Sequence, residues 1–296
     1  MDRFDLGAHT RPISTSSADA QKWFDLGLNW CFGFNHEEGV KCFQRALEAD
    51  PNCAMAHWGI AYGSGPFYNY PWRHFGAEEL AERTSRCHDH IEQARALAAH
   101  ASDAENALVE AIAARVQEPH GVAPEVLDRW DDDYRDAMRT VFERFPDDHD
   151  VMALFVESLI TRTPWHLWDV KTGQPAEGSD TLEALEVCDR SMMLTGQAGQ
   201  APHLAILHLY IHTMEMSDHP EQAMSAADHL ATMCPDAGHL NHMPGHIYVL
   251  CGEYEKARQA SIRAVAADDM YVDYAGKFNF YTTARCHDLH LMMYTC

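Results

Sequence analysis

The sequence has few basic residues, and this shortage excludes the commonest polyanionic partners. Only 22 Lys and Arg stand against 45 Asp and Glu, which gives a formal net charge of −23. A surface of this sign repels nucleic acid and anionic lipid headgroups. We therefore expect no nucleic acid and no membrane among the partners, and a solvated acidic surface.

Long apolar runs and cysteine motifs are also missing. No hydrophobic stretch reaches the roughly 18 residues of a spanning helix, and the opening residues MDRFDLGAHTRPISTSS lack the apolar core of a secretory signal. The nine cysteines form no C-x-x-C pair, and their number is odd. Scattered thiols are typical of a reducing compartment, where most pack as small core residues. The sequence predicts a cytoplasmic protein.

The chain does contain helical periodicity with the spacing of a repeat. Between residues 20 and 62, large and small residues alternate as in a tetratricopeptide (TPR) hairpin, and Asp50-Pro51 ends the second helix. Residues 204–237 and 238–271 form two further units with the ~34-residue TPR period. We predict an all-α, TPR-like superhelix of helical hairpins (an α-solenoid). It forms a single domain, 1–296, with regular repeats at about 20–62 and 204–271 and a degenerate middle at 77–200.

The degenerate middle still carries helix boundaries. Residues 77–117 read as two helices broken near 101–103, with Ser102 as the N-cap of the second. Helices are also expected at 123–145 and 148–161, followed by a loop over 165–179. A last helix from about Phe278 would be the first half of another hairpin, so we expect a truncated C-terminus or an unusual cap.

Histidine is concentrated in two stripes. His208, His212 and Glu215 are separated by four and then three residues, whereas His239, His242 and His246 have the reverse spacing. On a helix, each set shares one face. Counted in the TPR register, both stripes fall on the first helices of adjacent hairpins, which line the concave groove. This agreement predicts a metal site built from two neighbouring helices.

Pro244 complicates the second stripe. Inside a helix, proline removes one backbone donor and clashes with the carbonyl of residue 240, at a cost of about 3 kcal/mol or more. Two structures are possible: the helix kinks, or it begins near Pro244 with Asn241 or His242 as its cap. In the second case His239 and His242 would lie on a turn and would not share a face with His246.

The predicted ligands are all imidazoles, with one carboxylate nearby. Such a set is compatible with copper, non-haem iron or catalytic zinc, and we rank copper first, iron second and zinc third. Glu215 is either a further ligand or a general base. The final HDLH sequence repeats the H-x-x-H spacing. Whether His287 and His290 join the site stays open, and of the two His290 is included in the predicted set. The predicted metal ligands are His208, His212, His239, His242, His246 and His290.

The other end of the predicted groove is aromatic. Trp58 and Tyr62 occupy its inward positions, so we expect them to line a substrate pocket. The favoured interpretation is a metal-dependent oxidoreductase that acts on a small molecule, with a redox metal in the groove. Two alternatives remain: a peptide-binding adaptor without chemistry, which is the usual role of this architecture, and a zinc-dependent hydrolase with Glu215 as general base.

Several stretches of the sequence resemble a largely uncharacterised family of TPR proteins. The resemblance rests on the opening stretch RPISTSSADAQKWFDLGLNWCFGFNHEEGVKCFQRALEADPNCAMAHWGIAYGSGP and on the LHLYIH, GHLNHMPGHIYVLCGEY and HDLH motifs. It implies the TPR-like fold and supplies no mechanism. Members of that family tend to be longer, with further repeats after the position that matches His290.

Overall fold

The computed structural model describes residues 3–295, which divide into two compact units. The N-terminal unit comprises Thr10–Cys31 and His36–Pro164. The C-terminal unit comprises residues 3–9, Phe32–Asn35 and residues 165–295. The single domain expected over 1–296 stays a prediction.

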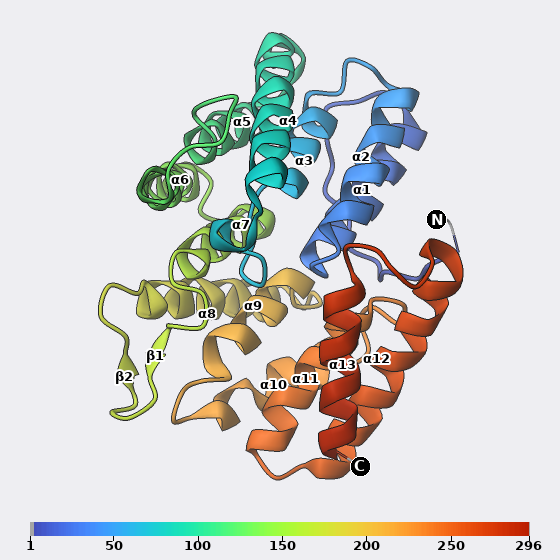
Figure 1. Cartoon of the computed structure of the whole chain (residues 1–296), viewed down its shortest axis with the longest axis vertical. Helices are drawn as coiled ribbons and strands as arrows, with labels where there is room; N and C mark the ends of the chain where they lie inside the picture. Colours follow the sequence, from blue (N-terminus) through green and yellow to red (C-terminus); the bar gives the residue numbers. More distant parts are fainter. Residues whose placement is uncertain (1–2, 296) are drawn as a thin grey trace. The chain divides into compact units, whose positions relative to one another are not determined.

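Each unit is an all-α assembly of helical hairpins, as the sequence predicts (Figure 1). Among the described residues, the only strands are one antiparallel pair of two residues each. The N-terminal unit contains α1 (Ala18–Phe32), α2 (His36–Ala49), α3 (Ala54–Ser64), α4 (Ala77–Ala96), α5 (Asp103–Arg115), α6 (Pro124–Arg144) and α7 (His149–Thr161). The C-terminal unit contains β1 (Trp168–Asp169), β2 (Gln174–Pro175), α8 (Thr181–Gln197), α9 (Leu204–Met214), α10 (Met224–Leu230), α11 (Gly238–Leu250), α12 (Tyr254–Ala275) and α13 (Thr282–Thr295).

The first hairpins close around one aromatic side chain. Phe43 of α2 is fully buried, and its ring lies against Gly27 of α1 and Gly59 of α3. A Cβ at Gly27 would come within 2.7 Å of the ring and one at Gly59 within 2.6 Å, closer than packed atoms approach. The small–large pattern that predicts a TPR hairpin is therefore the pattern that lets these helices pack.

Helix ends in the middle of the chain follow local capping chemistry. Ser102 and Glu105 form a capping box at the start of α5, as predicted, because each side chain accepts the other residue's backbone N–H. Pro124 occupies the first turn of α6, where its missing N–H costs nothing. Asp148 caps α7 by accepting from the amides of residues 150 and 151. The helices expected at 123–145 and 148–161 are thus α6 and α7.

The C-terminal unit is organised around two buried helices. Every residue of α9 is buried, and so are most residues of α11. α11 packs against α9, α10, α12 and α13, whose ribbons surround it in Figure 1. Polar side chains on α9 and α11 are therefore held inside the unit, where each needs a partner.

Pro244 lies within α11, which is continuous from Gly238 to Leu250. The alternative in which a helix begins at Pro244 does not occur. The side chain of Asn241 secures the first turn, because its amide donates to the carbonyls of Cys234, Pro235 and Ala237. The three histidines of α11 consequently share one helical face.

Two further features concern the described residues only. Across residues 3–295, no helix combines the length and the apolar character that crossing a bilayer requires. The eight cysteines in this range are free thiols; Cys251 and Cys286 are solvent-accessible and the others are buried, as expected for small core residues. Cys296 lies outside the described residues.

Candidate metal centre

Three helices of the C-terminal unit bring six histidines together. α9 and α13 both pack against α11, so their facing side chains converge on it. The rings form two groups, and in each group one ligand atom per residue lies within 4.8 Å of the other two. The groups adjoin, since the ring centroids of His239 and His242 are 5.8 Å apart. The inner group is His208, His212 and His239; the outer group is His242, His246 and His287.

In the inner group, hydrogen bonds define which ring nitrogens are protonated. His208 Nδ1 lies 2.7 Å from the carbonyl oxygen of Phe32, which can only accept, so Nδ1 carries the proton. His208 Nε2 is then a buried lone pair, and it has no hydrogen-bond partner among residues 3–295. His212 Nδ1 is 2.8 Å from Glu215 Oε1, and its Nε2 faces His239 Nε2 at 3.4 Å. Two unprotonated nitrogens are thus held inside this group.

In the outer group, two ring nitrogens face each other. The Nε2 atoms of His242 and His246 are 2.7 Å apart. Behind them, His242 Nδ1 is 3.2 Å from Asp288 Oδ1, at ion-pair distance but without hydrogen-bond alignment, and His246 Nδ1 is 3.1 Å from Glu215 Oε2. Glu215 beside His246 Nδ1 favours a proton there and leaves Nε2 of that ring bare. His242 Nε2 can then donate a hydrogen bond to His246 Nε2, or a cation bound by both nitrogens can hold the two rings together.

Burial keeps these rings neutral. It lowers the pKa of His208, His239 and His242 well below the usual range and that of His212 to about 3, and neighbouring rings lower them further. Neutral imidazole is the form that binds metals. The interior therefore presents unprotonated nitrogen donors throughout the neutral pH range.

A buried pair of acids, Asp268 and Asp288, lies beside α11 and the outer group. Burial raises the pKa of Asp268 to about 7, and burial beside Asp268 raises the pKa of Asp288 well above its usual range. Both carboxyls therefore favour the protonated form more than an exposed acid does. The Tyr281 hydroxyl accepts the backbone N–H of His239 at 2.8 Å. This contact satisfies a free amide in the first turn of α11, which has no side-chain N-cap.

Tyr281→Phe is expected to lower the free energy of unfolding by about 1–3 kcal/mol. The substitution removes one oxygen and leaves the His239 amide without this buried partner. Urea denaturation followed by circular dichroism measures the change. Tyr294→Phe is the matched control, since Tyr294 is 67% exposed and should shift the midpoint little. Equal effects of the two substitutions would contradict this account of the contact.

The structure brings five of the six predicted ligands together. His290 is the exception: it is exposed on α13 and belongs to neither group, whereas His287 completes the outer one. Three residues along a helix give a rotation of about 60° and a rise of about 4.5 Å, which turns His290 to solvent. The expected open groove is also absent at these rings, because His208, His212, His239 and His242 are at most 3% exposed.

Glu215 and the two aromatic residues lie elsewhere than predicted. Glu215 is the C-cap of α9 and faces the Nδ1 side of His212 and His246, so it is placed behind the rings rather than among the donor atoms. Trp58 and Tyr62 are 1% and 2% exposed in the core of the N-terminal unit. Their rings stack on each other at 5.1 Å and do not line an open pocket.

The segment Phe32–Asn35 contributes an aromatic ring to the site, which the sequence does not predict. The Phe34 ring is stacked on His212 and His239, with centroids 5.4 and 5.1 Å away, and lies 4.4 Å from His208. Its backbone is left-handed, with φ of 60°, an unfavourable conformation for an aromatic residue. Strained residues of this kind cluster at functional sites, but the sequence gives no signal that residue 34 meets residues 212 and 239.

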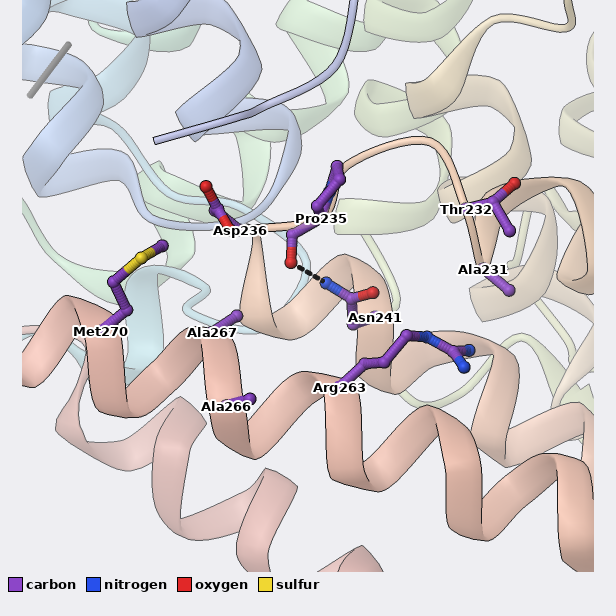
Figure 2. A pocket seen from close by; sticks show the side chains of 9 residues that line it. All are labelled: Ala231, Thr232, Pro235, Asp236, Asn241, Arg263, Ala266, Ala267 and Met270. Carbon is purple, nitrogen blue, oxygen red and sulfur yellow. Dashed lines mark hydrogen bonds between the residues drawn. The ribbon is translucent and has the colours of Figure 1, made fainter. Parts of the chain in front are cut away.

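The C-terminal unit also contains a cavity on another side of α11. It measures about 370 Å³ and lies between α11, α12 and the segment before α11 (Figure 2). Arg263 extends along it, and its guanidinium has no carboxylate within ion-pair distance among residues 3–295. The remaining lining is Ala231, Thr232, Pro235, Asp236, Asn241, Ala266, Ala267 and Met270.

The fold and the centre define a class: an all-α helical-hairpin protein with six clustered histidines in one unit. No protein-family model matches the chain, and no curated protein matches it either. Among solved structures, the crystal structure of the yeast Tom70 is similar, with a TM-score of 0.48 and 11% sequence identity. The match covers 94% of this chain and 55% of the Tom70 chain, so this chain spans about half the length of that protein.

Proposed function

We propose that the chain binds transition-metal ions through the six histidines and uses them for redox chemistry on a small molecule. The observation that carries this proposal is the contact between His242 Nε2 and His246 Nε2 at 2.7 Å, with an acidic side chain behind each ring. Two nitrogens bound to one ion at about 2.0–2.1 Å are roughly 3 Å apart. The Nε2–Nε2 distances in the two groups, 2.7 Å for His242–His246 and 3.4 Å for His212–His239, lie on either side of that value.

The donor set supports copper first. All donors are imidazole nitrogens, which suit copper, iron, nickel and zinc. The usual non-haem iron site needs a carboxylate on the metal, and Glu215 and Asp288 instead lie beside Nδ1 atoms. Zinc also accepts three histidines. The order is therefore copper, then zinc or iron.

Redox chemistry fits the surroundings better than hydrolysis. Hydrolysis at zinc requires a base beside the metal-bound water, and Glu215, predicted for that role, is already paired with two rings. A bound copper or iron ion would supply electron transfer to a substrate or to dioxygen. The chain's own contribution is to fix ring tautomers through Glu215 and the Phe32 carbonyl, and to keep water away from the inner group.

A peptide-binding adaptor is the second candidate, and the fold itself favours it. Helical-hairpin repeats commonly bind extended peptides, and nothing about such a fold requires a metal. The cavity beside Arg263 adds an apolar wall and a cation for an acidic end group (Figure 2). For this candidate, the histidines would be buried packing groups only.

Elemental analysis of untagged protein separates the candidates. We expect copper, or failing that zinc or iron, in at least stoichiometric amount, and loss of at least one equivalent in His212→Ala and in His242→Ala. His149→Ala in α7, outside both groups, should keep the full content. Metal-free wild-type protein that also fails to bind added copper or zinc would overturn the proposal and favour the adaptor.

A further inference from the structure

The two histidine groups differ in access to solvent. His208, His212 and His239 are 1%, 3% and 2% exposed. In the outer group His242 is buried, but the His246 side chain is 23% exposed and His287 is more exposed still. We propose that the groups are two non-equivalent metal positions, and that only the outer position accepts an external ligand. This inference rests on the proposed function and deepens it.

The inner position is closed by the segment Phe32–Asn35. The Phe34 ring covers all three inner imidazoles, and the Phe32 carbonyl takes the Nδ1 proton of His208. Phe34 is itself only 6% exposed. A metal there has protein on every side, which is the arrangement of a structural or electron-transfer position.

The outer position is completed by a helix that leaves one side free. Gly245 lets α13 approach α11, because a Cβ there would come within 2.8 Å of the Leu291 side chain. His287, one turn before Leu291, then reaches His242 and His246 with ring centroids 4.5 and 5.5 Å away. Three imidazoles on an ion that prefers four or more donors leave a coordination position open toward solvent.

The ligand class follows from this opening. A metal held by three neutral imidazoles keeps its positive charge and takes a small donor through oxygen or nitrogen, such as dioxygen or an anion. Glu215 joins the two positions, since Oε1 faces His212 of the inner group and Oε2 faces His246 of the outer group. The Glu215 carboxylate therefore contacts one ring of each group and fixes the position of the His212 ring relative to the His246 ring.

Cobalt(II) titration with azide as the external ligand tests the proposal. Cobalt(II) reports its coordination in the visible spectrum and binds imidazole sites. The wild type should bind two equivalents, and azide should change the bands of one. His287→Ala should bind one equivalent with no azide response, whereas His208→Ala should bind one equivalent that responds. The reverse pattern, or loss of both equivalents in each variant, would overturn the inference.

Phe34→Ala tests whether the Phe34 ring is what keeps azide from the inner position. Removing the ring should expose the inner position, so that azide changes the bands of both cobalt equivalents. Phe278→Ala is the control, because Phe278 is 92% exposed and should leave one responding equivalent. An unchanged Phe34→Ala response would overturn the closed inner position. Binding of one cobalt by the wild type would overturn the inference but leave the proposed function standing, and no binding would overturn both.

Discussion

Glu157→Gln is expected to lower the free energy of unfolding by about 3–5 kcal/mol. Glu157 of α7 forms a two-armed ion pair with Arg115 of α5, with contacts of 3.0 and 3.3 Å, and the side chains are 3% and 1% exposed. Glu157 also accepts from the Thr161 hydroxyl at 3.0 Å. The amide keeps the shape but leaves the Arg115 charge buried without its counter-ion, and that uncompensated charge causes the loss.

The chain offers a matched surface control. Glu110 forms a comparable pair with Arg95 at 2.8 Å, but the Glu110 side chain is 63% exposed. Glu110→Gln should cost at most about 1 kcal/mol, because water solvates both partners. Guanidinium denaturation of the two variants gives the comparison. Similar losses in the two variants would show that the buried Arg115 charge is not the cause of the effect of Glu157→Gln.

Glu215→Gln is expected to weaken metal binding by about 10–100-fold although it removes none of the six histidines. The carboxylate accepts from Nδ1 of His212 at 2.8 Å and stands 3.1 Å from Nδ1 of His246. An amide has one acceptor oxygen, so one of the two rings must turn or change tautomer and withdraw its Nε2 lone pair. Losses of this size are usual for residues that orient metal-binding histidines.

Competition with a chromogenic chelator measures that affinity. Glu221→Gln is the control, because Glu221 has a similar contact with His219 at 3.2 Å but is exposed and lies outside both groups. The control should bind metal as the wild type does. If Glu215→Gln also binds as the wild type, Glu215 does not orient the two rings.

Local signals explain why much of the fold was predictable. The capping box at Ser102 and the Gly27–Phe43–Gly59 contact depend on residues whose chemistry can be read directly from the sequence. The division into two units could not be read in this way. Repeat spacing gives no sign that Phe32–Asn35 belongs with residues 165–295 rather than with the helices on either side of it.

The sequence predicts which histidines share a face of one helix, but not which side chains from different helices meet. Helical spacing places His208 with His212, and His239 with His242 and His246, since both helices are regular. It does not distinguish His287 from His290, because the rotation of α13 depends on its packing against α11 at Gly245. It also does not show that Glu215 would face Nδ1 atoms rather than Nε2 atoms.

The most direct test of the central claim is anomalous X-ray diffraction from crystals of copper-loaded protein, with data collected on both sides of the copper absorption edge. We predict anomalous density at the converging Nε2 atoms of the outer group, bounded by His242, His246 and His287, and a second peak bounded by His208, His212 and His239. Well-ordered rings with no anomalous density at either position, or copper found only at surface histidines such as His290, would contradict the account.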